Sequence, residues 1–169
     1  GYGSIKGLGA NRVVNYFKNF LADKLMGIDL PGEVSGLVPS PEWKKSVKNE
    51  DWFLGDTYNI SIGQGDMQVT PLWLNTYAAA LANSGKLMKP YVVWQIKDAN
   101  SNIISETKPE VLKTVDFSRD IWDVVHEGMR KTVMAGTATM LQDLPVAVAA
   151  KTGTAQITGR GLNSLFIVY

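Results

Sequence analysis

Apolar residues recur at steps of three and four in three stretches of the chain, which predicts three amphipathic helices. The first is expected over residues 10–26, with Gly27 after it as a stop. The second begins at the cap-and-proline pair Thr70-Pro71 and ends near Gly85, and the third follows Ser118 and runs to about residue 135. Shorter helices are expected after Ser40-Pro41 and after residue 137. Residues 51–65 lack this period and are expected to be extended or irregular.

Runs rich in β-branched and aromatic residues predict two pairs of strands. Residues 91–97 and 103–107 flank the turn-forming stretch 98–102 and should form a hairpin. Residues 146–156 and 164–169 should form the second pair, around a turn at 158–161. Helices and strands together predict a mixed α and β fold. The last apolar run reaches the final residue, which suggests that the chain is part of a longer protein.

Composition narrows the choice of function without naming one. The chain has 169 residues, of which 45% are hydrophobic and 20% charged, and its net charge is +1. This length suits one domain or a large piece of one. The near-neutral balance gives no general attraction to nucleic acid or acidic lipid. The chain has no cysteine, which excludes disulfides, and a single histidine, so no zinc site is expected. No apolar run approaches the roughly 18 residues of a membrane span.

The stretch from residue 149 to 156, Ala-Ala-Lys-Thr-Gly-Thr-Ala-Gln, places polar side chains in a run that otherwise resembles a buried strand. The ammonium of Lys151 and the hydroxyl of Thr152 are closely spaced donors that suit a carboxylate. Gly153 removes a side chain that would keep a ligand away from the strand. From these residues alone, Lys151 is equally compatible with a solvated lysine on an edge strand, and Thr152 and Thr154 with ordinary strand formers.

Four stretches, in this order and spacing, resemble a known family. They are residues 27–33 (Gly-Ile-Asp-Leu-Pro-Gly-Glu), residues 55–57 (Gly-Asp-Thr) through 62–65 (Ile-Gly-Gln-Gly), residues 69–72 (Val-Thr-Pro-Leu) with the helix that ends at 83–85, and residues 150–156. Together they resemble the transpeptidase domain of class B penicillin-binding proteins of the elongation-specific type, penicillin-binding protein 2. Residues 1–169 are accordingly expected to form part of one such domain, with an antiparallel sheet flanked by helices that is incomplete in this chain.

The family uses three motifs: Ser-x-x-Lys for the nucleophile, Ser-x-Asn, and Lys-Thr-Gly. Only the third is present here in its expected context. Ser105 and Lys108 match Ser-x-x-Lys, but they lie beside Pro109 at a strand end, whereas the motif needs a helical turn. They also lie in the wrong place in the motif order, and we reject them. No Ser-x-Asn occurs in the chain. The nucleophile is therefore expected upstream of Gly1, and the chain alone is expected to be inactive.

The resemblance implies a role for each residue of the last motif. Lys151 and Thr152 would bind the terminal carboxylate of a D-alanyl-D-alanine stem peptide or of a β-lactam. Gly153 would let the substrate lie along the strand. The backbone N–H of Thr154 would be one of two oxyanion donors, the other belonging to the absent serine. No metal or organic cofactor is implied.

The same resemblance implies a parent enzyme: a serine-acylating D,D-transpeptidase that cross-links peptidoglycan at the outer face of the bacterial cytoplasmic membrane, with its anchor outside this chain. Its expected partners are cell-wall elongation proteins, including a glycosyltransferase. An alternative is a non-catalytic scaffold module that docks such proteins through residues 37–39 and the hairpin around Trp94. A relative of class A or class C β-lactamases is a third possibility, although the chain shows no convincing deacylating base.

Other conspicuous residues are expected to be structural. Gly63-Gln64-Gly65 lacks the further glycines or lysine of a phosphate loop and is expected to form a tight turn. His126 is expected to be a surface or half-buried residue rather than a catalytic base. Trp73 and Trp122 are expected in the core. A last set is expected to form a solvated helix face: Lys44, Lys45 and Lys48.

Overall fold

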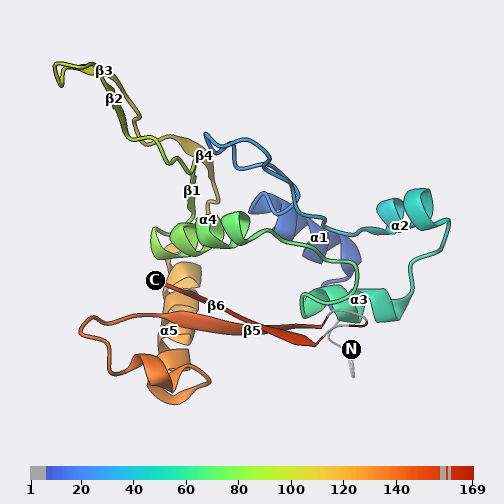
Figure 1. Ribbon diagram of the computed structural model, residues 1–169. Helices are drawn as coiled ribbons and strands as arrows, with labels where there is room; N and C mark the ends of the chain where they lie inside the picture. The colour runs from blue at the N-terminus through green and yellow to red at the C-terminus, as the bar shows by residue number, and fades with distance from the viewer. Residues whose placement is uncertain (1–6, 157–158, 160) are drawn as a thin grey trace.

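The computed structural model describes residues 7–156, 159 and 161–169. Helices and strands are mixed, as the sequence predicted (Figure 1). The elements are α1 (Ala10–Asn19), α2 (Pro41–Lys48), α3 (Leu54–Ser61), α4 (Pro71–Ala82), β1 (Lys86–Met88), β2 (Gln95–Lys97), β3 (Ile103–Glu106), β4 (Val111–Thr114), α5 (Arg119–Ala135), the 3-10 turn η1 (Thr139–Leu141), β5 (Ala150–Gln156) and β6 (Leu162–Val168). Among these helices none is long and apolar enough to cross a membrane.

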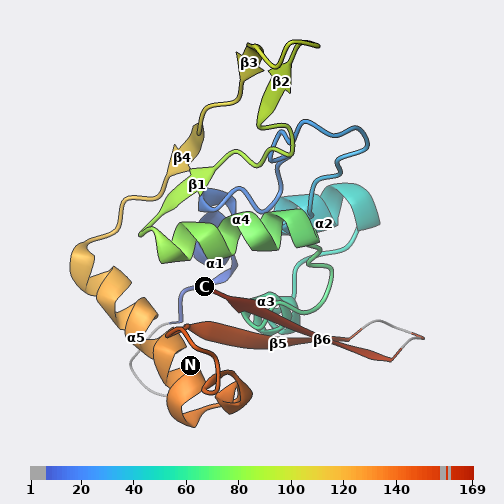
Figure 2. The same ribbon diagram turned by 60° about the vertical axis from the view of Figure 1, so that its left-hand side comes forward.

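The strands pair in three separate two-stranded antiparallel units, β1–β4, β2–β3 and β5–β6. The expected hairpin is confirmed as β2–β3, where the Asp98 carboxylate accepts hydrogen bonds from the backbone N–H groups of Asn100 and Asn102 in the turn. This hairpin projects away from the helices, whereas β5 and β6 lie across the other side of the molecule (Figures 1 and 2). β1 and β4 were not predicted from the sequence, because their few residues pair across a long separation in the chain. The expected turn at 158–161 falls largely outside the described residues.

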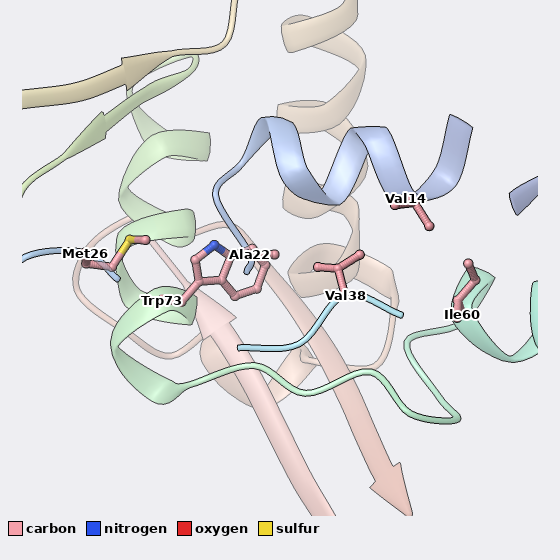
Figure 3. Close-up of a cluster of buried hydrophobic side chains, with 6 residues drawn as sticks. All are labelled: Val14, Ala22, Met26, Val38, Ile60 and Trp73. Carbon is pink, nitrogen blue, oxygen red and sulfur yellow. The ribbon is translucent and has the colours of Figure 1, made fainter. Parts of the chain in front are cut away.

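A hydrophobic cluster joins α1, α3 and α4 with the loops between them (Figure 3). One member is Trp73 of α4, which is 5% exposed and whose indole Nε1 donates to the carbonyl of Phe20 at 2.7 Å. A second cluster includes Trp122 of α5 and Leu81 of α4. Both tryptophans are therefore core residues, as predicted. The buried members of the first cluster are Val14, Ala22, Met26, Val38, Ile60 and Trp73.

Two helices begin where the sequence predicted. The hydroxyl of Ser40 accepts the N–H of Trp43 at 3.1 Å in α2, and the hydroxyl of Thr70 accepts the N–H of Trp73 at 3.1 Å in α4. Proline follows each cap at the first helical position, where its missing N–H costs no hydrogen bond. Ser118 also immediately precedes α5, but its side chain makes no capping hydrogen bond to the helix backbone.

The first helix is shorter than predicted and ends at Asn19 instead of about residue 26. Leu21 adopts a positive φ of 58°, and the N–H of Ala22 reaches back to the carbonyl of Phe17 at 3.2 Å. Tertiary contacts account for this early stop. The indole N–H of Trp73 donates a hydrogen bond to the carbonyl of Phe20. The turn after the helix places Ala22 in the core, where it has no exposed surface.

The prediction that residues 51–65 are irregular was wrong, because α3 forms within them. The Asp56 carboxylate of the Gly-Asp-Thr stretch accepts the N–H of Phe53 at 2.7 Å, which caps the helix. Asp56 also pairs with the ammonium of Lys44 at 2.8 Å. Hydrogen bonding to Lys44 and then to Phe53 lowers the pKa of Asp56 below its usual value.

The Lys44–Asp56 pair also shows that the prediction of a solvated lysine face on α2 is wrong for Lys44. Lys45 and Lys48 are exposed, but Lys44 is only 6% exposed because it turns inward to Asp56. The hydrogen bond to Asp56 raises the pKa of Lys44 and keeps it charged. Buried charges occur in proteins when they are paired in this way, so the pair explains both the buried lysine and the position of α3.

Residues 27–33 form a loop that is held in place by its two acidic side chains, Asp29 and Glu33. Glu33 accepts the backbone N–H groups of Met26, Gly27 and Ile28 within the loop. Asp29 accepts the N–H groups of Val92 and Val93, each at 2.8 Å, and so ties the loop to the base of the β2–β3 hairpin. These backbone hydrogen bonds, Val93 first, lower the pKa of Asp29.

Candidate functional site: the free edge of strand β5

β5 is fixed at its first residue by burial. Ala150 has no exposed surface and packs with Val133 of α5 and with Ala138. Just before it, the Arg130 guanidinium donates to the carbonyl of Val148 at 2.6 Å. From Lys151 to Gln156 the strand has no fully buried residue. The structure therefore anchors the start of β5 and leaves the motif residues accessible.

The register of β5 on β6 determines which backbone groups remain free. Ala149 and Tyr169 exchange both of their N–H to C=O hydrogen bonds, at 2.8 and 3.0 Å. In an antiparallel pair such doubly bonded positions alternate with positions whose N–H and C=O groups point away from the partner strand. With the pairing in step from Ala150 to Gln156, the backbone groups of Thr152 and Thr154 point to the outer edge. This is the orientation that the expected Thr154 oxyanion donor requires.

The polar side chains of the motif gather along that edge. The ammonium of Lys151 donates to the carbonyl of Thr152 at 2.6 Å, and it forms no ion pair with a carboxylate within the described ranges. The hydroxyls of Thr152 and Thr137 lie 2.7 Å apart. Thr137 comes from the turn after α5 and was not among the predicted site residues. A cation without a carboxylate partner in the described chain and a hydroxyl held by another hydroxyl are suited to an anionic ligand.

A groove of about 460 Å³ lies beside the edge, between the turn after α5 and the β5–β6 pair. Thr137, Met140, Thr152, Thr154 and Phe166 are among the residues that line it. On the other face of the strands, a smaller hollow of about 260 Å³ includes Lys151 with Met67 and Trp73. The predicted residues Lys151, Thr152, Gly153 and Thr154 are thus brought together at one accessible edge between two grooves.

Among the residues that the structure describes, none packs so closely on Gly153 that glycine is required there. A Cβ built at this position would meet only the carbonyl oxygen of Leu165, at 3.9 Å, which is an ordinary contact. Its φ is also outside the left-handed range, so an alanine would not strain the backbone. Packing among the described residues therefore does not require glycine at this position, and the space beside it is open to a ligand.

Gln64 also reaches the edge, which the sequence analysis did not predict. Gly63 and Gly65 have φ values of 72° and 78°, and they form the expected tight turn. From the tip of this turn, the Gln64 side-chain amide donates to the carbonyl of Thr154 at 3.0 Å. Nothing in the sequence distinguishes a glutamine that faces solvent from one that contacts a strand 90 residues later.

Ser105, Lys108 and His126 lie outside the candidate site. Ser105 is an exposed residue of β3 on the projecting hairpin, so Lys108 is not one helical turn away from it. His126 is half-buried, with its Nε2 at 2.6 Å from the carbonyl of Leu81. In the described part of the chain, no group of three His, Asp or Glu side chains could hold a metal ion.

Comparison with known proteins identifies the family. A family model described as the penicillin binding protein transpeptidase domain matches residues 4–167. Peptidoglycan D,D-transpeptidase MrdA of Acinetobacter baumannii is 31% identical over 150 residues, which cover 89% of this chain and 22% of that protein. Penicillin-binding protein 2A of Bacillus subtilis is 36% identical over 148 residues, 84% of this chain and 19% of that protein. The chain thus spans about a fifth of the length of these relatives.

Solved structures agree with the sequence relatives. The chain resembles PBP2 of Pseudomonas aeruginosa, solved in complex with WCK 5153, with a TM-score of 0.80 and 31% identity over 96% of this chain and 36% of that one. It also resembles PBP2 of Helicobacter pylori in complex with MreC, with a TM-score of 0.74 and 27% identity over 89% of this chain and 27% of that one. With the family model matching nearly its whole length, the chain belongs to the penicillin-binding protein transpeptidase domain family, in the class B group of the PBP2 or MrdA type.

Proposed function

We propose that this chain supplies the substrate-binding edge of a peptidoglycan D,D-transpeptidase. The observation that carries the proposal is the free edge of β5, where the Lys151 ammonium has no carboxylate partner among the described residues and the Thr152 hydroxyl is held by Thr137. Lys151 and Thr152 bind the terminal carboxylate of the D-alanyl-D-alanine stem peptide. Hydrogen bonds to a charged group contribute about 1.5–3 kcal/mol each, so this pair contributes substantially to substrate binding.

In the proposed reaction the substrate lies along the outer edge of β5 as an added strand. A serine from a part of the protein outside this chain attacks the carbonyl of the penultimate D-alanine. The N–H of Thr154 stabilises the negative charge that develops on the carbonyl oxygen. The terminal D-alanine leaves with a proton, and an amine of a neighbouring peptide then displaces the serine to form the cross-link. A β-lactam enters the same site and acylates the same serine.

Acylation by a fluorescent penicillin tests this function in a full-length protein that carries this segment. Removing the Lys151 ammonium in Lys151→Ala should slow acylation about 10- to 100-fold, as expected for one lost charged hydrogen bond. Lys131→Ala is the matched control, because Lys131 is an exposed lysine paired with Glu127 on α5. An unchanged acylation rate in Lys151→Ala would contradict the proposal, as would equal losses in both variants.

The 169-residue chain on its own should not be labelled, because the proposed reaction takes its serine from outside it. Labelling of the isolated chain near one penicillin per molecule would show that this assignment of the nucleophile is wrong. Steady hydrolysis of a chromogenic cephalosporin by the full-length protein would instead favour the β-lactamase-like alternative.

We also propose that the full-length protein works at the outer face of the cytoplasmic membrane with other cell-wall elongation proteins. One of the similar structures is a complex of PBP2 with MreC, and another is a peptidoglycan synthase complex that coordinates polymerization and crosslinking.

For the scaffold alternative, Val38 and Pro39 are excluded as a docking surface because both are buried. The β2–β3 hairpin remains available, with Trp94 61% exposed.

A further inference from the structure

The far half of β5 has little support besides β6. Thr154 is exposed, and the buried anchor of the strand lies at Ala150, near its start. Within the described residues, two side-chain hydrogen bonds reach the motif residues from other elements. One joins the hydroxyls of Thr137 and Thr152, and the other runs from the Gln64 amide to the Thr154 carbonyl. Gln64 is therefore the tertiary support nearest to the proposed oxyanion donor.

The backbone that carries Gln64 is itself well fixed. The N–H of Gln64 donates to the carbonyl of Asn59 at 2.9 Å, and the N–H of Gly63 donates to the carbonyl of Ile60 at 3.1 Å. Ile60 is buried in the hydrophobic cluster of α1, α3 and α4. Gly65 lies so close to Asn59 that an added Cβ would be 3.2 Å from the Asn59 Cβ. The turn thus extends from the packed end of α3, and the Gln64 side chain connects this fixed turn to β5 through its hydrogen bond to Thr154.

A hydrogen bond to the Thr154 carbonyl constrains the peptide plane that follows Thr154. The N–H of Thr154 belongs to the peptide plane before it, and both groups point to the same outer edge of the strand. Holding the carbonyl therefore limits rotation of the whole residue. An oxyanion donor is effective only when it is aimed in advance at the position where the charge develops.

We propose that Gln64 is a positioning residue that holds Thr154 in the orientation needed to stabilise the acylation transition state. This inference rests on the proposed function. Gln64 acts through its side-chain N–H, which donates to the Thr154 carbonyl and needs no contact with substrate. A carbonyl oxygen has two lone pairs, so the Thr154 carbonyl can keep this bond while substrate occupies the edge.

The test first removes the Gln64 donor and then replaces it with an acceptor of the same shape. In the full-length protein, Gln64→Ala should lower the first-order acylation constant for a fluorescent penicillin about 3- to 10-fold, the loss expected for one hydrogen bond. The dissociation constant of the initial penicillin complex should stay unchanged. Gln64→Glu should be slower still at about pH 8, because an ionised carboxylate only accepts hydrogen bonds and would face the Thr154 carbonyl.

The pH dependence separates positioning from a general effect on folding. As the pH falls from about 8 toward about 4.5, near the ordinary glutamate pKa, the carboxyl introduced by Gln64→Glu gains a proton and becomes a donor. The ratio of the Gln64→Glu rate to the wild-type rate should therefore rise. Asn83→Asp is the matched control, because the Asn83 amide donates to the carbonyl of Lys86 at 2.9 Å, outside the site. Its rate per folded molecule and its rate ratio to wild type should stay constant across this pH range.

Each outcome of this test has a distinct meaning. A flat ratio for Gln64→Glu, or an unchanged acylation constant in Gln64→Ala, overturns the positioning role. If wild-type protein is acylated, Lys151→Ala is slow and the Gln64 variants behave like wild type, only this inference fails. If wild-type protein is not acylated, or Lys151→Ala is acylated at the wild-type rate, the proposed function fails first.

Discussion

The β5–β6 and β2–β3 pairs are both two-stranded and antiparallel, yet the chain holds them in place by different means. β5 packs against α5 and β6 against α4, whereas β2 and β3 pack substantially only against each other among the described elements. The base of the β2–β3 hairpin is tied to the molecule by the hydrogen bonds that Asp29 accepts from Val92 and Val93. β5 is thus anchored by burial at its first residue, Ala150, whereas the projecting hairpin is attached by polar contacts at its base.

The comparison is tested most strongly by placing the same charge in both strand pairs. Ala150→Asp should destabilise the protein by about 3–4 kcal/mol, because Ala150 has no exposed surface and packs in an apolar cluster with Val133 and Ala138. Ile104→Asp in β3 should change the free energy of unfolding by less than about 0.5 kcal/mol, because Ile104 is 67% exposed. Urea unfolding of both variants measures the difference. Equal losses would show that the β2–β3 hairpin is packed in solution.

A smaller effect should separate function from stability within β5 itself. Gly153→Ala should keep the free energy of unfolding within about 1 kcal/mol of wild type, because glycine gains no packing advantage here. Penicillin acylation in the full-length protein should fall about tenfold, which corresponds to about 1.4 kcal/mol, because the new methyl group would occupy space beside the edge where we propose that the ligand binds. Unchanged acylation together with unchanged stability would remove Gly153 from the proposed site.

The smallest expected effect is a weakening, at low pH, of the hydrogen bonds by which Asp29 holds the base of the β2–β3 hairpin. The pKa of Asp29 is lowered in the folded state by its backbone hydrogen bonds. Its contribution to stability is therefore present above the ordinary aspartate pKa of about 3.9 and is lost as the pH falls through the lower folded-state value. Protection of the Val92 and Val93 amides from hydrogen exchange should decrease below about pH 4.

Asp29→Asn should weaken that protection already at neutral pH, because asparagine offers one acceptor oxygen where the two amides use both oxygens of Asp29. Asp123→Asn, at an exposed position on α5, is the control and should leave both amides protected. Protection that is the same for wild type and Asp29→Asn at neutral pH would show that the hairpin is held by other contacts.

Local signals in the sequence predicted the elements whose boundaries they encode. The pairs Ser40-Pro41 and Thr70-Pro71 specify a capped helix start, and the structure confirms both. Asp98 and its neighbours specify the turn of the β2–β3 hairpin. Two of the wrong predictions, the end of α1 and the absence of a helix in residues 51–65, both depend on contacts between distant residues. α1 ends early because Trp73 takes the Phe20 carbonyl, and α3 forms where Asp56 pairs with Lys44. In both cases the deciding partner lies 12 or more residues away.

The amino-acid sequence by itself singled out Lys151, Thr152, Gly153 and Thr154 as a contiguous polar stretch, and its resemblance to a known family suggested their binding roles, which the residues alone had left open. Only the tertiary structure decided which edge of that strand is free, and that Thr137 and Gln64 reach it. The physical reason is that hydrogen-bond register and long-range side-chain contacts depend on how distant segments pack. Neither property is encoded in any short stretch of residues.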